Sequence, residues 1–414
     1  MEVKPGHKLT EIGIIPEKWE ATFLGSILSK GRLGGNYANQ DAETELPLMK
    51  MGNLARGYFD LSKVQFITPG IKCEPAHRLV YGDVLLNTRN TLDLVGKVAI
   101  WRNEISVAYY NSNLIRLEFD PAKVCSNEYA NYALNTKGVI SRLRELATGT
   151  TSVAAIYTRD LIKLQVLVPP LPEQRAIAQA LSDVDALIAA LERLIAKKRD
   201  IKQATMQQLL NGKTRLPGFS GKWKLERLGD LAEMGSGGTP LSSVAAYYDG
   251  EIPWVSISDM TKGGKTIGST ERNLTALGFS NSSAQMFPSG TILYAMYASI
   301  GECSIAGVPL CTSQAILGIR TNENLRPDFL YYYLTSLKAK VKTLGQQGTQ
   351  ANLNKAIVQD FVLGLPTTDE QTAIAAVLSD MAAELTALEA RRDKTRALKQ
   401  GMMQELLTGK TRLL

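Results

Sequence analysis

The chain has 414 residues, of which 44% are hydrophobic and 21% are charged, and this length exceeds one ordinary hydrophobic core, so two or three domains are expected. Its formal net charge of +7 allows a polyanionic partner without requiring one. No apolar run of 18 residues occurs, and the four cysteines and two histidines show no metal-ligand spacing. The sequence therefore predicts no membrane span and no metal site, and it favours a reduced, cytoplasmic protein.

Residues 1–170 are predicted to form a mixed α/β domain. Short β-rich runs, among them VQFI, VLLN and KVAI, are separated by Gly, Asn and Pro. Residues 171–215 are then predicted to form a long helix, because apolar residues recur at alternating steps of four and three, as in a coiled-coil seam. The predicted seam consists of Ile177, Leu181, Val184, Ile188, Leu191 and Ile195.

Residues 216–366 are predicted to form a second mixed α/β domain, with the β-rich runs TILYAMY and AILGIR. Residues 367–414 return to the helical pattern, which Arg392 interrupts near the middle. The seam predicted for this second helix consists of Ile374, Leu378, Met381, Leu385 and Leu388.

The two helical segments are copies of each other. The phrase LLNGKTRL at 209–216 returns as LLTGKTRL at 406–413, and at the same offset of 197 the pair Glu173-Gln174 falls on Glu370-Gln371. A P-loop is excluded because glutamine stands where its first glycine is required, so each Gly-Lys-Thr is interpreted as a helix end. The α/β regions correspond more loosely, as GDVLL and GTILY show. We therefore predict an α+β fold with a pseudo-two-fold internal repeat: two mixed α/β domains separated by two long helices that form an antiparallel coiled coil.

We call the two predicted α/β domains head 1 (residues 1–170) and head 2 (residues 216–366). Two heads of different sequence held at a fixed spacing suit a target with two separated, unequal half-sites, and duplex DNA is such a target. Base edges are read by Arg, Lys, Asn, Gln, Ser and Thr, and Tyr also contacts DNA. The candidate DNA contacts are Asn36, Lys50, Asn53, Arg56, Asn87, Arg89 and Asn90 in the first head, and Thr239, Ser256, Ser258, Tyr294, Tyr297, Gln346, Gln347, Gln350 and Asn352 in the second.

The motifs KPGHKLTEIGIIPEKW, PPLPEQRAIAQALSDVDALI, LLNGKTRLPGFSGKW, DEQTAIAAVLSD and LLTGKTRL resemble the specificity subunit of type I restriction-modification systems. The resemblance extends over the organisation of the whole chain, and its motifs cover the two helices and their flanks. It implies that the variable regions are target recognition domains, each reading half of a bipartite, asymmetric DNA site. It also implies that the repeated helices act as a ruler and dock two modification subunits, to which restriction subunits are added.

The same resemblance places the chemistry in the partners. S-adenosylmethionine, ATP and Mg would be bound by the modification and restriction subunits, and no catalytic, cofactor-binding or metal residue is expected in this chain. The sequence agrees, since it lacks an amino-methyltransferase motif, and GSGG at 235–238 lacks dinucleotide-binding spacing. Two alternatives stay open: the specificity subunit of a type II-like modification system, and a coiled-coil scaffold whose heads bind proteins.

Overall fold

The computed structural model describes residues 5–346 and 353–413. It divides into two compact units, of which unit 1 contains Met1–Glu192 and Arg391–Leu414, and unit 2 contains Arg193–Ala390. The two long helices, α4 (Leu171–Leu210) and α10 (Thr368–Leu406), each contribute one part to either unit. Each unit is thus a head of mixed secondary structure with two helical segments, and the predicted α+β repeat fold is confirmed.

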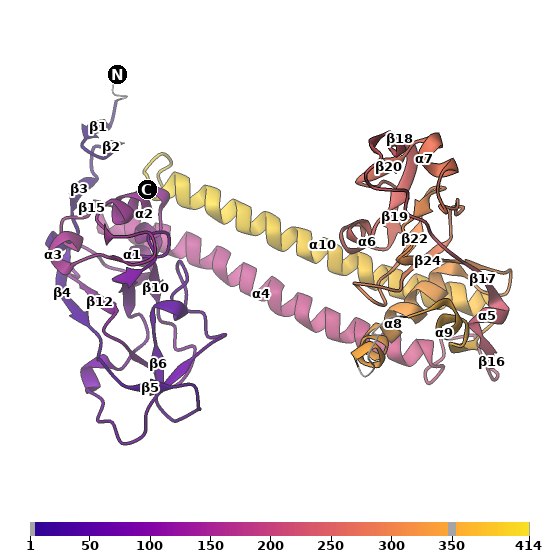
Figure 1. Cartoon of the computed structure of the whole chain (residues 1–414). Coiled ribbons are helices and arrows are strands. Elements are labelled where there is room, and N and C mark those ends of the chain that lie inside the picture. Colours follow the sequence, from indigo (N-terminus) through magenta and orange to yellow (C-terminus); the bar gives the residue numbers. More distant parts are fainter. Residues whose placement is uncertain (1–4, 347–352, 414) are drawn as a thin grey trace. The chain divides into compact units, whose positions relative to one another are not determined.

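Head 1, drawn in indigo to purple in Figure 1, is built on a four-stranded antiparallel sheet with the order β10-β8-β12-β4. Smaller sheets have the orders β11-β6-β7-β5 and β13-β14-β9, and β15 pairs with β3 and β1 with β2. The strands are β1 (His7–Thr10), β2 (Gly13–Pro16), β3 (Glu20–Phe23), β4 (Leu28–Leu33), β5 (Asn39–Gln40), β6 (Pro47–Met49), β7 (Gln65–Ile67), β8 (Val84–Asn87), β9 (Arg89–Asn90), β10 (Val98–Ile100), β11 (Tyr109–Tyr110), β12 (Leu114–Phe119), β13 (Thr148–Gly149), β14 (Ala154–Ala155) and β15 (Gln165–Val168). The helices are α1 (Asn127–Leu134), α2 (Lys137–Glu145) and α3 (Thr158–Leu161), with 3₁₀ turns at Leu24–Ser26, Met51–Asn53 and Pro75–His77.

The first three residues of strand β8 are apolar because both of its faces are covered. Side chains alternate between the faces of a strand, so Val84 and Leu86 enter one hydrophobic cluster while Leu85 enters another. Both faces of β8 are therefore covered, and no residue of the strand is exposed. The β-rich runs of the sequence all contain strands, in head 1 and in head 2.

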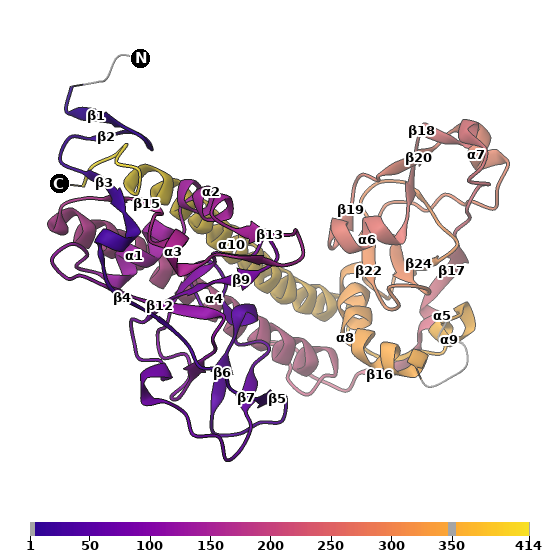
Figure 2. The same cartoon turned by 60° about the vertical axis from the view of Figure 1, so that its left-hand side comes forward.

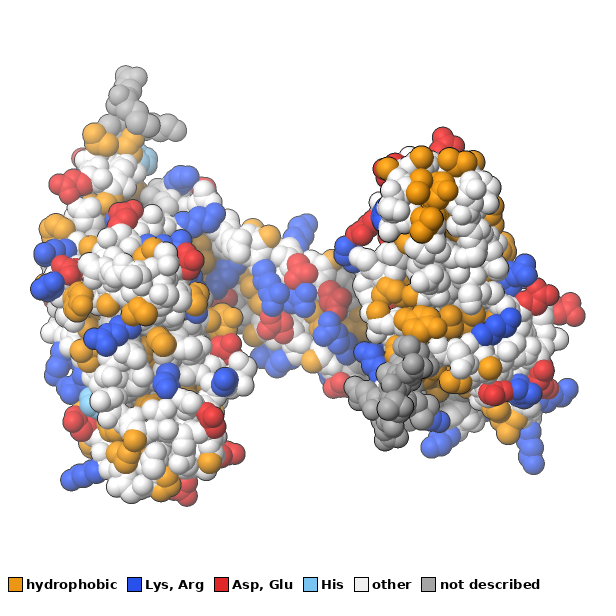
Figure 3. All heavy atoms as spheres, in the orientation of Figure 1, with side chains coloured by type: hydrophobic (Ala, Val, Ile, Leu, Met, Phe, Trp, Pro, Cys, Tyr) orange, Lys and Arg blue, Asp and Glu red, His pale blue; other side chains and the backbone are white. Residues whose placement is uncertain are grey.

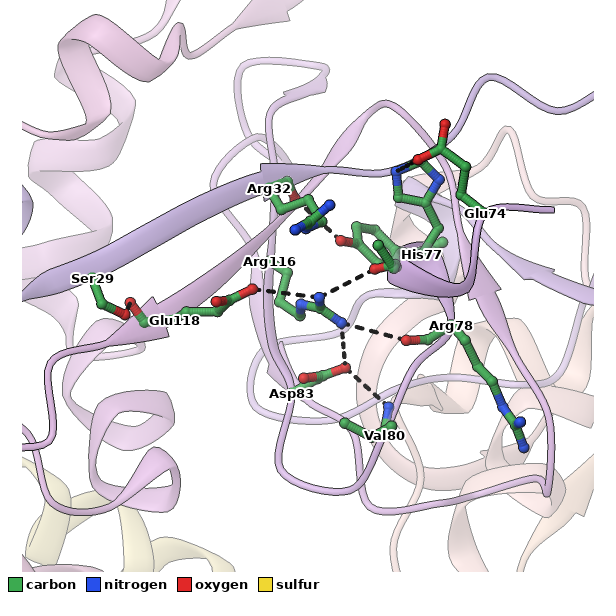
Figure 4. A network of polar contacts seen from close by, with 11 residues as sticks. Ser29, Arg32, Glu74, His77, Arg78, Val80, Asp83, Arg116 and Glu118 are labelled. Atoms are coloured by element: carbon green, nitrogen blue, oxygen red, sulfur yellow. Dashed lines mark hydrogen bonds and ion pairs between the residues drawn. The ribbon is translucent and has the colours of Figure 1, made fainter.

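A half-buried polar network joins β12 of the main sheet of head 1 to the segment that precedes β8 (Figure 4). The Arg116 guanidinium, on β12, donates to the Asp83 carboxylate at 3.1 Å and to the carbonyl of Ala76 at 3.1 Å. Burial raises the pKa of Asp83, although the Val80 N–H and Arg116 both favour its charged form. The network holds the Pro75–His77 turn against β12, because Arg116 bonds both elements.

Head 2 is built on a five-stranded sheet with the order β17-β24-β21-β22-β19, accompanied by β20-β18-β23 and the pair β16-β25. The strands are β16 (Lys224–Arg227), β17 (Ala232–Ser236), β18 (Tyr248–Val255), β19 (Thr266–Ile267), β20 (Arg272–Leu274), β21 (Ile292–Ala295), β22 (Cys303–Ala306), β23 (Cys311–Thr312), β24 (Ile316–Thr321) and β25 (Val362–Leu365). The helices are α5 (Leu228–Leu231), α6 (Ile257–Gly263), α7 (Ala276–Ser280), α8 (Pro327–Gln346) and α9 (Lys355–Gln359), with a 3₁₀ turn at Ala245–Tyr247.

The two heads share one topology despite their divergent sequences. The order β10-β8-β12-β4 of head 1 corresponds to β22-β21-β24-β17 of head 2, with the same antiparallel pairings. In each head a short strand pairs in parallel with a strand of the second sheet, β11 with β6 and β23 with β18. The chain therefore repeats its heads as well as its helices.

Each unit contains a packed pair of antiparallel helical segments. In unit 1 Leu406 and Leu407 of α10 share a buried cluster with Ile177 and Leu181 of α4, and in unit 2 the end of α4 packs likewise with the start of α10. Opposite charges join the segments, as Arg396 bonds Glu192 at 2.5 Å in unit 1 and Arg199 bonds Glu389 in unit 2. Of the predicted seam, Ile177, Leu181, Leu191, Ile195, Ile374, Leu378 and Leu385 are buried, and Val184, Ile188, Met381 and Leu388 are half-buried.

Candidate DNA-recognition heads and the contacts that close them

Three of the predicted DNA contacts lie in the interior. The side-chain amide of Asn53 donates to the carbonyls of Asp60 and Lys63 and its oxygen accepts the Lys50 N–H, so the side chain holds a turn together. Asn87 is used in the same way by the loop that follows β8. Tyr294 is fully buried in β21, where burial raises its pKa. We therefore remove Asn53, Asn87 and Tyr294 from the candidate DNA contacts.

The other predicted contacts differ in how far they reach the surface. Ser256 caps α6 by accepting the N–H of Asp259, and the ammonium of Lys50 donates to Asn39 and Gln65, so the fold already uses both side chains. Gln346 is the last residue of α8, and Gln347, Gln350 and Asn352 lie outside the described residues. The exposed candidates are Asn36, Arg89, Thr239 and Tyr297, and the half-buried ones are Lys50, Arg56, Asn90, Ser256 and Ser258.

Head 1 brings together Arg89 and Asn90, which form β9, and it adds a segment that the sequence analysis did not single out. Strand β9 pairs with β14, the second strand of a hairpin whose tip is exposed at Thr150–Val153. The signal for this hairpin was a run of small hydroxyl residues after a glycine, which is hard to distinguish from an ordinary polar loop. Figure 3 shows scattered charges of both signs on the visible face of head 1, without a broad basic patch.

A buried carboxylate closes unit 1. Glu173, in the first turn of α4, has only 2% of its surface exposed. It accepts the indole N–H of Trp19 at 2.9 Å and a guanidinium N–H of Arg412 at 2.6 Å. The guanidinium also lies 6.0 Å from the centre of the Trp19 ring, within the range of a cation–π contact. We call Trp19, Glu173 and Arg412 the unit 1 latch.

Unit 2 has the same latch, formed by Trp223, Glu370 and Arg215. Glu370, in the first turn of α10, accepts the Trp223 indole N–H at 3.1 Å and two guanidinium N–H groups of Arg215, at 2.5 and 2.6 Å. The Arg215 guanidinium lies 5.5 Å from the Trp223 ring centre. Glu370 is even more deeply buried than its counterpart, so both carboxylates need these charged and polar partners.

The glutamine beside each latch carboxylate is fully buried and fixes the start of its helix. The side-chain amide of Gln174 donates to the carbonyls of Pro169 and Lys123, and its oxygen accepts the Cys125 N–H. In unit 2, Gln371 makes the same three bonds, to Pro366, Asn324 and Arg326. The repeated Glu-Gln pair thus joins each head to the helix that follows it.

The repeated phrase ends each helix and supplies the arginine of a latch. Gly212 and Gly409 have φ values of 68° and 73°, the left-handed conformation that ends a helix, which agrees with the helix-end interpretation. Arg412, from the second copy of the phrase, completes unit 1, whereas Arg215, from the first copy, completes unit 2. Each head is therefore closed by the arginine that follows the other head in sequence.

Among the described residues, no group of His, Cys, Asp or Glu side chains is arranged to hold a metal ion. Within the same residues, no helix combines the length and apolarity needed to cross a membrane. All four cysteines are free, and burial raises the pKa of Cys303 and Cys311 in head 2. These thiols behave as small core side chains, since raised pKa values disfavour the reactive thiolate.

Comparison with known proteins identifies relatives along the whole chain. The family model described as type I restriction modification DNA specificity domain matches twice, over residues 16–201 and 220–396. A Methanocaldococcus jannaschii protein assigned as the MjaX type I restriction enzyme specificity subunit is 26% identical, covering 98% of this chain and 96% of its own length. The EcoR124I/EcoR124II specificity subunit of Escherichia coli is 25% identical over 61% of this chain and 62% of its own length.

Solved structures show the same fold. The crystal structure of a type I restriction-modification S subunit from M. genitalium matches with a TM-score of 0.58 and 15% identity, covering 98% of both chains. A chain from a structure of type I restriction-modification complex assembly matches with a TM-score of 0.60 and 17% identity, over 96% of this chain and 99% of that one.

Removal of the latch carboxylate should open unit 1 selectively. Glu173→Ala leaves the Arg412 guanidinium and the Trp19 N–H without their acceptor, and breaking a buried ion pair costs about 3 kcal/mol. Amide hydrogen exchange of β3 and β15 should therefore accelerate by at least 100-fold, with head 2 unchanged. The matched control is Glu192→Ala, which removes a solvent-exposed ion pair worth about 0–1 kcal/mol. Equal exchange rates in both variants would show that the latch does not hold the unit.

A fragment of residues 1–216 should form a dimer through exchanged latches. It contains Trp19 and Glu173 but lacks Arg412, and its own Arg215 has the same sequence surroundings as Arg412. Arg215 of one copy should therefore complete the latch of the other copy, in both directions. Light scattering should give a dimer, Arg215→Ala should give a monomer, and Lys213→Ala, which alters an exposed cation of the same phrase, should stay dimeric. A monomeric unmodified fragment would contradict latch exchange.

Proposed function

This chain belongs to the type I restriction-modification DNA specificity family, and from that premise we propose that it reads a bipartite, asymmetric DNA site with one head per half-site. The observation that carries the proposal is the combination of one repeated frame with two divergent heads. The sheets, latches and helix pairs are repeated, whereas the exposed side chains around equivalent strands differ. A duplicated frame with different surfaces suits two similar but unequal targets, such as the halves of an asymmetric DNA site.

We further propose that the helix pairs dock two modification subunits. Exposed positions of the helices that are identical in both repeats, and that the fold leaves unused, support two copies of one partner. Gln203 and Gln207 in unit 2 recur as Gln400 and Gln404 in unit 1, and their side chains make no polar contact with other described residues. A neighbouring exposed position differs, with glutamine at 208 and glutamate at 405. We define Gln203 with Gln207, and Gln400 with Gln404, as the two glutamine surfaces.

The chemistry of the assembly is proposed to reside in its partners. Modification subunits would bind S-adenosylmethionine and flip and methylate the target base, and restriction subunits would use ATP and Mg for translocation and cleavage. This chain would supply binding energy and register without a catalytic group of its own. A type II-like modification system with the same subunit would differ only in its partners, so purification of the native complex distinguishes the two.

Exchange of one head should change one half of the recognised site. Replacing residues 228–361 with the matching segment of a relative keeps Trp223, Arg215 and the β16–β25 pair, so unit 2 should still close. Methylation-aware sequencing of DNA modified by the complex should show one new half-site and one unchanged half-site. The exchange of residues 24–164 in head 1 is the reciprocal control. Simultaneous change of both halves would mean that the heads do not read independently.

Charge placed on one glutamine surface should remove one modification subunit. Gln203→Glu with Gln207→Glu puts two carboxylates into the proposed interface, and an unpaired buried charge costs more than about 1–3 kcal/mol, or at least 5- to 150-fold in affinity. Native mass spectrometry should show one modification subunit per chain instead of two, and the same result for Gln400→Glu with Gln404→Glu. Gln208→Glu is the matched control, because the other repeat already has glutamate there. Full occupancy in all variants would reject these surfaces.

A further inference from the structure

Strands β13, β14 and β9 form a small sheet in head 1, and β9 follows β8 directly in the chain (Figure 2 labels β9 and β13). The hairpin β13–β14 is closed by the Thr150 N–H, which donates to the Val153 carbonyl at 2.9 Å, and by the Val153 N–H, which donates to the Thr150 hydroxyl at 3.2 Å. Gly149 has a φ of 126°, and a Cβ there would come within 2.3 Å of the Val153 carbonyl oxygen. The hairpin therefore has a defined shape that requires this glycine.

The side chains at the tip of this sheet are exposed, with the Ser152 hydroxyl 3.1 Å from the Thr150 hydroxyl inside the hairpin. Thr151, Ser152 and Val153 are exposed, Val153 with 70% of its surface. Arg89, on the neighbouring strand β9, is exposed and makes no ion pair or polar side-chain contact with the described residues. The small sheet thus exposes a guanidinium, two hydroxyls and an apolar group, and none of them contributes to closing the head.

Both heads attach this part of the chain at the same place. The Ile156 N–H donates to the carbonyl of Thr88, just after β8, at 2.9 Å, and in head 2 the Leu353 N–H donates to the carbonyl of Met296, just after the equivalent strand β21, at 3.3 Å. The residues before the two attachment points read TGTTSVAA at 148–155 and GQQGTQAN at 345–352. The segment before the attachment point therefore differs in sequence between the two heads, as an element of specificity requires.

Basic side chains lie along the loop that follows β9. The Arg56 guanidinium donates to the Gly96 carbonyl at 3.4 Å, and burial and the nearby Arg144 lower the pKa of Arg56. Burial, and then Arg56, also lower the pKa of Lys97, in spite of Asp60. Arg144 has a carboxylate partner in Asp93, 3.9 Å away and largely exposed. Arg56 thus has a cation nearby in both Arg144 and Lys97, and a DNA phosphate bound beside Arg56 would relieve this repulsion.

We propose that the β13–β14 hairpin and Arg89 form the base-reading element of head 1, with Arg56, Lys97 and Arg144 on the flanking phosphates. A two-stranded ribbon fits the major groove, and its side chains match base edges there. Arg89 would bond guanine, the hydroxyls of Thr151 and Ser152 would bond either partner of a pair, and Val153 would contact a thymine methyl group. This inference rests on the proposed reading of one half-site by each head.

The test uses the full chain with its modification subunits and duplexes that contain the site found by methylation-aware sequencing. Every base pair of both half-sites is substituted singly, and binding is measured at several salt concentrations. Arg89→Ala should reduce discrimination at one or two base pairs of one half-site by about 5- to 150-fold and leave the other half-site unchanged. Thr151→Asn with Ser152→Gly, a pair that suits a tight hairpin turn, should change preference at neighbouring positions of the same half-site.

Two further variants separate base reading from phosphate binding. Arg144→Ala should weaken binding to all duplexes equally and reduce the slope of log affinity against log salt by about one. Lys72→Ala removes an exposed cation after β7, outside the small sheet, and should leave discrimination unchanged. The inference is overturned if Arg89→Ala and the turn variant, both with wild-type thermal stability, keep the wild-type base profile or lose affinity uniformly. Failure of the wild-type complex to discriminate either half-site would instead refute the proposed function.

Discussion

A carboxylate enclosed by an indole and a guanidinium is the interaction on which each half of this protein depends. Glu173 and Glu370 are almost completely removed from water, and a buried charge is costly unless it is paired and hydrogen-bonded. Each carboxylate accepts hydrogen bonds from groups outside its own helix. One donor is a tryptophan near the start of the head, and the other is the arginine that follows the end of the other long helix. Head, helix start and helix end therefore meet at one point in each unit.

Arg412 brings the end of the sequence to the unit that contains its beginning. Unit 1 is assembled from both extremes of the sequence, whereas unit 2 uses one uninterrupted stretch. The repeated sheets, latches and helix pairs form without contributions from the exposed side chains of the heads. Those exposed side chains can therefore differ between the heads. The repeated residues therefore maintain the fold, whereas the divergent ones are available for the proposed reading of two different half-sites.

The long-range repeat could be predicted from the sequence because coiled-coil spacing and β-rich runs are local patterns. The seam residues and strands such as β8 follow from periodicity alone. The accessibility of single side chains could not be predicted in this way, as Asn87 illustrates. Its polar chemistry suggested a surface contact, but its amide is required by the loop at Leu94 and Lys97, and only the folded chain brings that loop around it.

The latch carboxylates illustrate the opposite case. Glutamate near a helix start is ordinarily solvated, so its chemistry alone gave no reason to place Glu173 in the interior. The identical Glu-Gln pair in both copies was the available signal, together with the identical arginine at the far end of each helix. The antiparallel pairing was predicted, but linking these two signals also required knowing that each glutamate lies beside the arginine that follows the other helix, which no local pattern specifies. The TGTTSV hairpin was missed for a related reason, because its exposed hydroxyls resemble any polar loop.

The separation of latch partners along the chain also affects how the protein is made. Trp19 and Glu173 leave the ribosome long before Arg412, which follows Glu173 by 239 residues. At about 5–20 residues per second, the site stays open for roughly 10–50 s. Arg215 emerges early in that interval, just after helix α4, whose 40 residues make it about 60 Å long. Until Arg412 emerges, the guanidinium with the matching sequence context on a neighbouring nascent chain is its Arg215, so exchange between chains is the reaction that competes with correct closure.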